Sequence, residues 1–550
     1  DRVPDIPLTD EGFMHWGKDM QHRGGSAIRK LTFKNFTDYD NKKGLTDEGY
    51  AAIARASPRL EYLCVENCRR FGTGALATIA QHCPKLSELT LRMSSPSSSS
   101  PSGSPSPLLH AAGFESIAAR CKDLATLDIT GLDCERDQDL CRGITTILTN
   151  CNKLVKLRLD ISIGATPAFW QWETEESGLY SFGYLSDAIE KCANLRELSI
   201  GCHANSGGSA FIKQVGVHCR LLEKLHVTIT PTQENKDLLE DLTLVAKNCS
   251  LSSLSISIKK RSNPSTGPLD LPEGGGVDSL GAPPVQKAAL GSSDSALETL
   301  VSLCPQLKSF TLRVEDLRLS DTGVSKAIKG MGPCLSQLSV VTQTIGTETI
   351  TAVGIAGCRQ LKYLQLATPN PKPHHNPQDA KTSPANEAFK TLCLGCPSLT
   401  EVDLSNLPIS ILPRESELLT SITKLGQLKK LSLPRHASLS VEGLVTMLKE
   451  SPSLRHLEPP MSLVETIKSQ PYIHKQNEVV ATFERLGISS KALQVGEHDS
   501  RGLDEARKVN EQVAKNNGQQ PVLLGARDSV MAAGAGAIYS RDSQLACAVQ

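Results

Sequence analysis

The sequence predicts a right-handed α/β solenoid, with a parallel β-sheet on its concave face and helices on its convex face. Three observations support this prediction. The aliphatic pattern LxxLxL recurs along most of the 550 residues. Stretches with apolar residues at helical spacing lie between successive copies. A cysteine stands just before many of the copies, at a fixed place. Units of strand, turn and helix that stack on one another explain all three.

The LxxLxL segments predict the strands of about 14 repeats. Their first apolar residues are 26 to 30 positions apart in eight of thirteen steps and 32 to 56 apart in the others, which is a leucine-rich-repeat period with insertions. In LEYLCVE, alternation along a strand should turn Leu60, Leu63 and Val65 toward the core, and Tyr62 and Cys64 toward the concave face. The first apolar residues are Ile28, Leu60, Leu86, Leu124, Leu154, Leu195, Leu222, Leu251, Leu307, Leu335, Leu361, Leu399, Leu428 and Leu454.

The segments between the strands predict helices. GLTDEGYAAIARASPRL, from Gly44, and LSDTGVSKAIKGMG, from Leu319, both carry an acidic residue near their start and continue with apolar residues at helical spacing. Asp47 and Asp321 stand where an N-cap side chain would accept protons from the first amides of a helix. We therefore expect each of them to cap its own helix.

Eight of the 17 cysteines stand at one fixed position of the repeat. A small apolar side chain with a weak S–H donor suits a buried turn between a helix and a strand. Ser57 and Ser451 replace the cysteine in two repeats. This distribution predicts structural thiols in a reducing compartment rather than a disulfide framework. The cysteines three residues before a first leucine are Cys83, Cys121, Cys151, Cys192, Cys219, Cys304, Cys358 and Cys396.

Charge and hydropathy exclude several classes of protein. The 59 basic and 59 acidic residues cancel, so the sequence lacks the basic excess that nucleic-acid binding requires. The sequence contains no apolar run long enough to span a bilayer, and it does not open with a signal peptide. We therefore expect a cytoplasmic or nuclear protein.

The repeats resemble a known class. TDEGY with IARASPRLEYL, and LATIAQHCPKLSELTL, are similar to the cysteine-containing leucine-rich repeats, which are best known from F-box/leucine-rich-repeat proteins. Members of that family are substrate receptors of cullin-RING ubiquitin ligases. The resemblance covers about residues 8 to 458. An F-box is not visible, and ILPRESELLTSITKL, from Ile411, is expected to be a repeat helix because it falls between two predicted strands.

The N-terminus bears on the missing F-box. PLTDEGFMHWGKDM, from Pro7, repeats the LTDEG that begins at Leu45, so the chain opens inside a repeat whose strand is absent. A solenoid needs a cap over its terminal core. We therefore expect further sequence before residue 1. An F-box in that segment would contact a cullin-RING adaptor, as the family resemblance implies.

Composition divides the chain into four parts. Residues 1–27 are a partial N-terminal repeat, and residues 28–460 are the solenoid. Residues 461–516 have helical patterns that predict a C-terminal cap, and residues 517–550 are a flexible tail. Inserts rich in Ser, Pro or Gly are expected to be disordered near 94–108, 259–295 and 367–386.

The tail ends in CAVQ, which matches the CaaX pattern of prenylated proteins. Cys547 is therefore a candidate prenylation site. The alternative is that the match is a coincidence and that the thiol is unmodified. The sequence near it has no polybasic segment and no second cysteine, so one lipid would give only a weak, reversible membrane attachment. Peripheral membrane attachment is thus a corollary of prenylation.

The sequence predicts no catalytic, cofactor or metal site. It contains no Walker loop, Rossmann fingerprint, zinc-protease helix or nucleophile elbow. Cys393 and Cys396 form a CxxC, and His374 and His375 lie upstream, but no second CxxC completes a zinc site. We therefore expect a protein that is not an enzyme and that binds no cofactor.

The concave face is the expected binding surface for a protein or peptide, since its charges are of both signs. Two hypotheses follow: a substrate-recognition part of an F-box-type ubiquitin ligase, or a leucine-rich-repeat scaffold or signalling adaptor without a ubiquitin link. Further polar residues expected on this face are Lys30, Lys34, Glu88, Asp128, Asp160 and Lys430. The candidate partner-binding residues are Tyr62, Glu66, Arg92, Lys156, Arg158, Lys224, His226, Arg313, Tyr363, Glu401 and Asp403.

Overall fold

The computed structural model describes two compact units, which we call unit 1 and unit 2. Unit 1 is drawn from residues 1–251, 259–280 and 535–550, and unit 2 from residues 252–258 and 281–534. Within these, the described residues are 10–22, 28–34, 45–68, 70–92, 109–131, 137–160, 185–203, 208–230, 236–258, 291–315, 319–369, 383–408, 411–434, 437, 440–458, 523–524 and 546–549.

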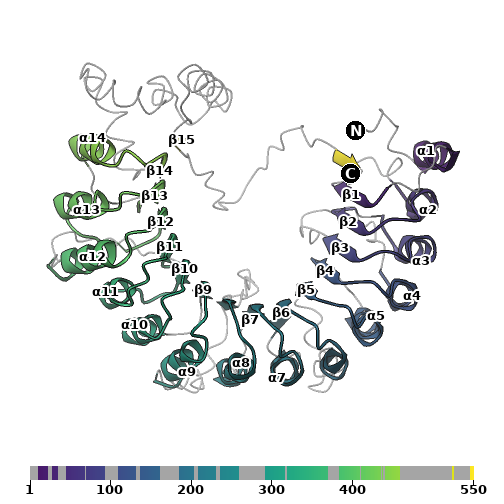
Figure 1. Ribbon diagram of the computed structural model, residues 1–550, viewed down its shortest axis with the longest axis horizontal. Coiled ribbons are helices and arrows are strands. Elements are labelled where there is room, and N and C mark those ends of the chain that lie inside the picture. The colour runs from purple at the N-terminus through teal and green to yellow at the C-terminus, as the bar shows by residue number, and fades with distance from the viewer. Residues whose placement is uncertain are drawn as a thin grey trace, which may run out of the picture. The chain divides into compact units, whose positions relative to one another are not determined.

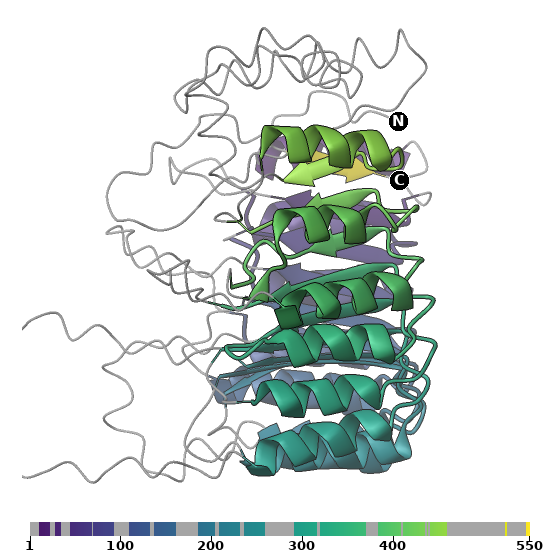
Figure 2. The same ribbon diagram turned by 90° about the vertical axis from the view of Figure 1, so that its left-hand side faces the viewer.

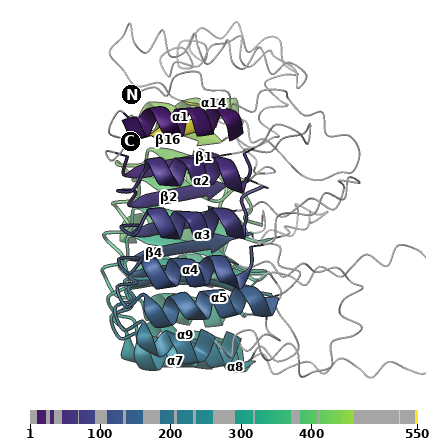
Figure 3. The same ribbon diagram turned by 90° about the vertical axis from the view of Figure 1, so that its right-hand side faces the viewer.

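Unit 1 alternates parallel strands with helices, and the helices lie on one side of the strands (Figures 1 and 3). Neighbouring strands along the chain are neighbours in the sheet. Its parallel strands are β1 (Lys30–Lys34), β2 (Tyr62–Glu66), β3 (Glu88–Arg92), β4 (Thr126–Thr130), β5 (Lys156–Asp160), β6 (Glu197–His203) and β7 (Lys224–Thr230), and β16 (Ala546–Val549) pairs antiparallel with β1. Its helices are α1 (Asp10–His22), α2 (Asp47–Ala56), α3 (Thr73–His82), α4 (Ala111–Arg120), α5 (Asp137–Asn150), η2 (Ile189–Lys191), α7 (Gly208–His218) and α8 (Lys236–Asn248).

Unit 2 repeats the same alternation, and its helices stack side by side (Figure 2). Its strands are β8 (Ser253–Ile258), β9 (Ser309–Val314), β10 (Gln337–Val341), β11 (Tyr363–Ala367), β12 (Glu401–Asp403), β13 (Lys430–Ser432), β14 (His456–Glu458) and β15 (Leu523–Leu524). Its helices are α9 (Gly291–Ser302), α10 (Asp321–Lys329), α11 (Thr347–Ile355), α12 (Ser383–Gly395), α13 (Glu415–Ile422) and α14 (Val441–Glu450).

The predicted alternation of parallel strands and helices is confirmed in both units. The stretch from Ile411 contains a repeat helix, α13, as expected. Two predicted inserts are shorter than expected in the described residues, because α9 begins at Gly291 and α12 begins at Ser383. The remainder of the three inserts and the predicted cap at 461–516 lie outside the described residues.

The aliphatic triplets form the core of each unit. Leu60, Leu63 and Val65 are at most 1% exposed. The pairing is in register, so Leu63 lies beside Leu89 and every triplet stacks on the next. Burying one such side chain contributes roughly 2 kcal/mol, which explains why a single repeat cannot fold alone but a stack can.

The repeat cysteines cap the helices of unit 1 and link each repeat to the one before it. Cys83 ends α3, and its carbonyl oxygen accepts hydrogen bonds from the Leu86 amide and from the thiol of Cys121, at 3.1 and 3.6 Å. The thiols of Cys151 and Cys219 donate in the same way to Cys121 and Cys192. We call this series the thiol ladder. It gives a physical reason for a weak donor of small volume at this place in the sequence.

One member of the thiol ladder was missed from the sequence. Cys249 is buried and its thiol donates to the carbonyl oxygen of Cys219 at 3.3 Å. It precedes Leu251 by two residues rather than three, so the fixed-spacing criterion did not select it. Ser57 and Ser451 end α2 and α14 at the equivalent place, as predicted.

Burial makes the ladder thiols poor nucleophiles. It raises the pKa of Cys83, Cys121 and Cys219 to about 12. A thiol reacts as its thiolate, so these side chains are inert at neutral pH while the fold is intact. All the cysteines with described side chains are free thiols, and all of them except Cys334 are buried.

We expect Cys121→Ser to lower the free energy of unfolding by about 1 kcal/mol, because the hydroxyl keeps a donor for the Cys83 carbonyl oxygen but is costlier to bury. Cys121→Leu should cost about 3 kcal/mol, since the larger side chain overpacks the turn. Urea unfolding measures both. Equal losses for the two variants would show that side-chain volume does not select cysteine here.

The acidic residues that open the helices do not cap their own helices, which corrects the expectation for Asp47 and Asp321. Thr46 and Ser320 are the N-caps of α2 and α10. Asp47 instead accepts a hydrogen bond from the amide of Gly72, the N-cap of the next helix, at 2.8 Å. The motif therefore joins neighbouring repeats.

Asp321 has the largest set of such contacts. Its carboxylate accepts hydrogen bonds from the amides of Gly346, Glu348 and Thr349 at 2.8, 3.1 and 3.2 Å, and from the Thr349 hydroxyl at 2.5 Å. These are the first amides of α11, where a negative charge is favoured by the unpaired donors and the helix dipole. Asp321 thus caps the helix of the following repeat.

Glycines make room for these carboxylates. A Cβ on Gly346 would lie 2.3 Å from an oxygen of Asp321, and one on Gly49 would lie 2.5 Å from an oxygen of Asp10. Asp10 accepts hydrogen bonds from the amide and hydroxyl of Thr46, so the same arrangement recurs at the start of unit 1. The repeated TDEG segment therefore encodes a carboxylate and the space for its neighbour.

Candidate functional site

The open face of the sheet, which is the face away from the helices, carries the candidate partner-binding residues. In β3, for example, Leu89 and Leu91 are buried in the core, whereas Glu88 and Arg92, at alternate positions, are exposed on this side. Residues on neighbouring strands are aligned by the parallel register, so they form rows across the open face. Ion pairs join residues of these rows in unit 1, whereas hydrogen bonds join them in unit 2.

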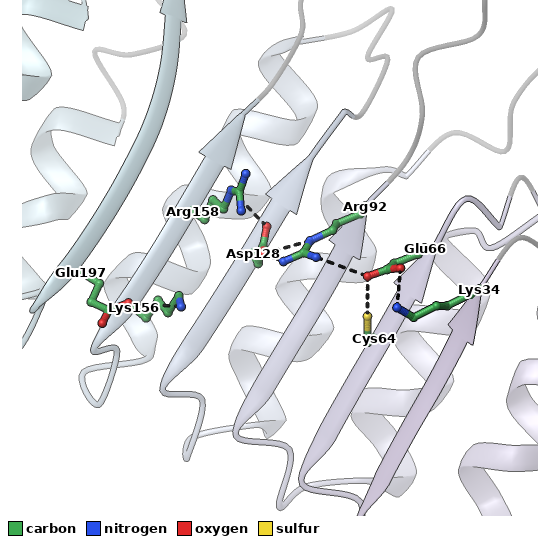
Figure 4. A network of polar contacts seen from close by, with 8 residues as sticks. All are labelled: Lys34, Cys64, Glu66, Arg92, Asp128, Lys156, Arg158 and Glu197. Atoms are coloured by element: carbon green, nitrogen blue, oxygen red, sulfur yellow. Dashed lines mark hydrogen bonds and ion pairs between the residues drawn. The ribbon is translucent and has the colours of Figure 1, made fainter. Parts of the chain in front are cut away.

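Unit 1 carries a chain of alternating charges along its open face (Figure 4). The Lys34 ammonium group lies 3.0 Å from Glu66, whose other carboxylate oxygen lies 3.3 Å from the Arg92 guanidinium group. Arg92 reaches Asp128 at 2.7 Å, and Arg158 lies 3.9 Å from the second oxygen of Asp128. These five residues, one on each strand from β1 to β5, we call the charge ladder.

The surroundings of the ladder shift the pKa values of two of its members, Glu66 and Arg92. Burial alone would raise the pKa of Glu66, but hydrogen bonds and charge from Lys34, with contributions from Cys64 and Arg92, lower it below its ordinary value. The hydrogen bond to Asp128 raises the pKa of Arg92, although partial burial opposes it. Both shifts favour the charged forms of Glu66 and Arg92.

A second group of charges lies at the other end of the strands. Glu197 on β6 accepts hydrogen bonds from Lys224 on β7 and pairs with Lys156 on β5 at 3.2 Å. The hydrogen bond from Lys224 lowers the pKa of Glu197, with burial opposing and Lys156 adding to the effect. Both lysines are thus held by one carboxylate.

Tyr62 and Cys64 precede Glu66 at alternate positions of β2. Cys64 faces the open side, as predicted, but is only 2% exposed, and its thiol donates to Glu66 at 3.5 Å. Burial, followed by a hydrogen bond involving Cys64, raises the pKa of Tyr62 to about 12. The phenol is therefore neutral and available for packing against a partner.

On the open face of unit 2, hydrogen bonds join polar side chains of β10, β11 and β12. The Ser339 hydroxyl donates to the side-chain oxygen of Gln365 at 2.6 Å, and the amide of Gln365 donates to Asp403 at 2.9 Å. Tyr363 and Glu401 are neighbours in the register, and burial together with Asp403 and Glu401 raises the pKa of Tyr363. This face is a hydrogen-bonded row rather than a chain of ion pairs.

The predicted binding residues thus separate into groups. Glu66, Arg92 and Arg158 belong to the charge ladder, Lys156 and Lys224 share Glu197, and His226 contacts Thr228 at 3.2 Å. Tyr363, Glu401 and Asp403 lie on the open face of unit 2, where Arg313 pairs with Glu315. Sequence reasoning placed Asp128 on this face but not among the candidates, and it missed Glu197. Aligning the strand copies residue by residue would have found both.

The predicted CaaX cysteine lies in β16 (Ala546–Val549), which pairs antiparallel with β1. Cys547 is opposite Phe33 in this register. Prenylation of Cys547 stays a prediction.

Metal-binding clusters of three or more His, Cys, Asp or Glu are absent from the described residues. In the CxxC, the Cys396 thiol donates to the carbonyl oxygen of Val353, and burial raises the pKa of Cys393 to about 12. His374 and His375 lie outside the described residues. In the same described part of the chain, none of the helices combines the length and apolar character that crossing a bilayer requires.

No protein-family model matches the chain. Among solved structures, the chain is similar to one in the crystal structure of the Rad7 and Elc1 complex in yeast, at 14% sequence identity and a TM-score of 0.38. The similarity covers 82% of this chain and 83% of that chain. A likeness at this level carries no argument about function. The parallel strands that alternate with helices in both units fit a leucine-rich-repeat-type solenoid.

Proposed function

We propose that the chain is a protein-recognition solenoid whose main binding surface is the open face of unit 1. The observation that supports this proposal is the charge ladder, which holds side chains of both signs in fixed positions across five strands. Ordering long charged side chains before binding reduces the entropy that a partner must overcome. Alternating charges suit a surface with its own mixed charges and repel a uniform polyanion.

The proposal extends to a role as the substrate-recognition part of an F-box-type ubiquitin ligase receptor. The support is the resemblance of the repeats to the cysteine-containing class. In this role the chain is not an enzyme itself, and a cullin-RING adaptor would be contacted through sequence outside the repeats. The inert thiols suit a cytoplasmic or nuclear protein, whereas attachment to a membrane would depend on Cys547.

Site-specific photocrosslinking in cells tests both the recognition of a partner by the open face and the role in a ubiquitin ligase. A photoreactive residue at Ser199, on the open face, should yield discrete crosslinks to a partner, whereas one at Val217, an exposed residue of α7 in the same unit, should not. Ubiquitylation of the partner should depend on this protein, and a cullin should co-purify with it.

Each outcome has a distinct meaning. The same products from both positions would contradict recognition by the open face. Discrete products from Ser199 without a cullin, and without any change in partner ubiquitylation, would support a scaffold or signalling adaptor instead of a ligase receptor.

A further inference from the structure

The charge ladder ends in two buried polar atoms that lack hydrogen-bond partners among the described residues. They are the Oδ1 atom of Asp128 and the Nε atom of Arg158. The Asp128 side chain is only 5% exposed, and its Oδ2 atom accepts two hydrogen bonds from Arg92, at 2.7 and 3.2 Å. A buried carboxylate oxygen without a donor costs more free energy than a satisfied one gains, so this arrangement requires an explanation.

The two unsatisfied atoms face each other. They are 3.9 Å apart, so an approach of roughly 1 Å would form an ordinary charge-assisted hydrogen bond. Asp128 is itself fixed by Arg92. Asp128 can therefore hold the inner edge of the Arg158 guanidinium group and leave the outer edge, with its two terminal nitrogens, directed away from the ladder (Figure 4).

Two acidic positions lie near Arg158 on this face: Glu197, whose carboxylate pairs with Lys156 and Lys224, and Asp160, which lies beside Gly201 in the register of the sheet. The Arg158 side chain is 43% exposed and forms no other ion pair among the described residues. In the register of the sheet, Arg158 lies beside Ser199 on β6, followed by His226 on β7. Gly201, two residues after Ser199, has no side chain, and a glycine inside a strand often marks a close approach by another backbone.

We propose that Arg158, positioned by Asp128, binds an aspartate or glutamate side chain of a protein partner whose backbone passes over Gly201. This inference rests on the proposed recognition by unit 1 and names the chemistry of what is recognised. A guanidinium fork matches the two oxygens of a carboxylate, and the Ser199 hydroxyl adds a donor on the next strand. On binding, the Nε atom of Arg158 and the Oδ1 atom of Asp128 would approach each other and form a hydrogen bond.

A carboxylate fits better than a phosphate group because, among the described residues near Gly201, Arg158 is the cation left to bind it. Arg92 is engaged by Asp128 and Glu66, and Lys156 and Lys224 are engaged by Glu197. A dianionic phosphate would leave about one negative charge without a counterion.

Binding to an array of peptides tests the proposal. Dodecamers with randomised flanks carry a central glutamate, glutamine, lysine or phosphoserine, and the full-length protein is the probe. We expect selective binding to the glutamate series. Arg158→Ala should weaken the best glutamate peptide by at least about tenfold, and Arg158→Lys should restore only part of the loss, because an ammonium group lacks the fork. Arg142→Ala, which removes an exposed arginine of α5, should change nothing.

Asp128→Asn separates positioning from binding. It should weaken the same peptide less than Arg158→Ala does. In the wild type, the Nε–H signal of Arg158 should shift on peptide binding, and this shift should be lost in the Asp128→Asn variant. A merely structural role for Asp128 would leave that signal responding as before.

Three results would overturn the inference. They are equal binding of the glutamate and glutamine series, an unchanged affinity in Arg158→Ala, and a preference for phosphoserine. If any of these occurs while photocrosslinks from Ser199 persist, recognition by unit 1 stands and only the acidic contact is wrong. If the acidic contact fails and the photocrosslinks from Ser199 are also absent, the proposed function is contradicted as well.

Discussion

Replacing Gly354 with alanine should lower the free energy of unfolding of unit 2 by about 3 kcal/mol. A new Cβ would lie 2.5 Å from the carbonyl carbon and oxygen of Thr391 and 2.7 Å from the amide nitrogen of Leu392. These are backbone atoms of α12, so they cannot rotate away as a side chain could. Helix propensity alone predicts the opposite sign, because alanine favours a helix over glycine by about 1 kcal/mol. The sign of the effect therefore distinguishes the two explanations.

Hydrogen–deuterium exchange of the amides in α11 and α12, measured on the full chain, reports this loss locally. Gly426→Ala is the matched control, because a Cβ there meets nothing within 4 Å, and it should change stability by no more than about 0.5 kcal/mol. Protection of α11 that is unchanged or increased in Gly354→Ala would show that the two helices can move apart without cost. Gly395 belongs to the same contact, since its Cβ would lie 2.0 Å from the Gly354 carbonyl oxygen.

Asp321→Ala should destabilise unit 2 by about 2 to 3 kcal/mol. The substitution removes a charged acceptor from three amides at the start of α11 and from the Thr349 hydroxyl. Asp321→Asn keeps an acceptor but loses the charge, and should cost about half as much. Urea unfolding gives the magnitude, and exchange of the α11 amides locates it. Glu298→Gln, at an exposed position of α9, is the control and should be neutral.

A double-mutant cycle tests whether the glycine serves the carboxylate. Gly346→Ala alone should destabilise unit 2, because the new Cβ would lie 2.3 Å from an oxygen of Asp321. In the Asp321→Ala background that collision disappears, so the two losses should not add, and the coupling should be about 1 to 2 kcal/mol. Additive losses would mean that Gly346 is required for some reason other than Asp321.

The strands of this fold were predictable because their signal is local. LxxLxL fixes both the strand and its buried side, and in-register stacking follows once the triplets recur, as Leu63 and Leu89 show. The roles of Asp47 and Asp321 were not predictable in the same way. The sequence places each of them at a helix start, but the amides that they bind belong to the next repeat. The distance between repeats is a property of the stack, and no single segment encodes it.

The candidate site was likewise predictable only in part. Alternation along each strand correctly placed Glu66, Arg92 and Arg158 on one face. It could not show that Asp128, between Arg92 and Arg158, is almost fully buried and unsatisfied at one oxygen, because that depends on the lengths and rotamers of the neighbouring side chains. It also could not separate the ion-paired face of unit 1 from the hydrogen-bonded face of unit 2. That difference appears only when the residues of successive strands are aligned by their register.

Each cysteine of the thiol ladder can report local unfolding of its own repeat. The thiol of Cys151 is fully buried, and burial raises its pKa to about 11. It can therefore react with an oxidant or an alkylating reagent only when the turn around it opens. Each rung belongs to a different repeat, from Cys83 to Cys249 in unit 1. The order in which these rungs are modified under mild stress would therefore trace where the stack begins to come apart.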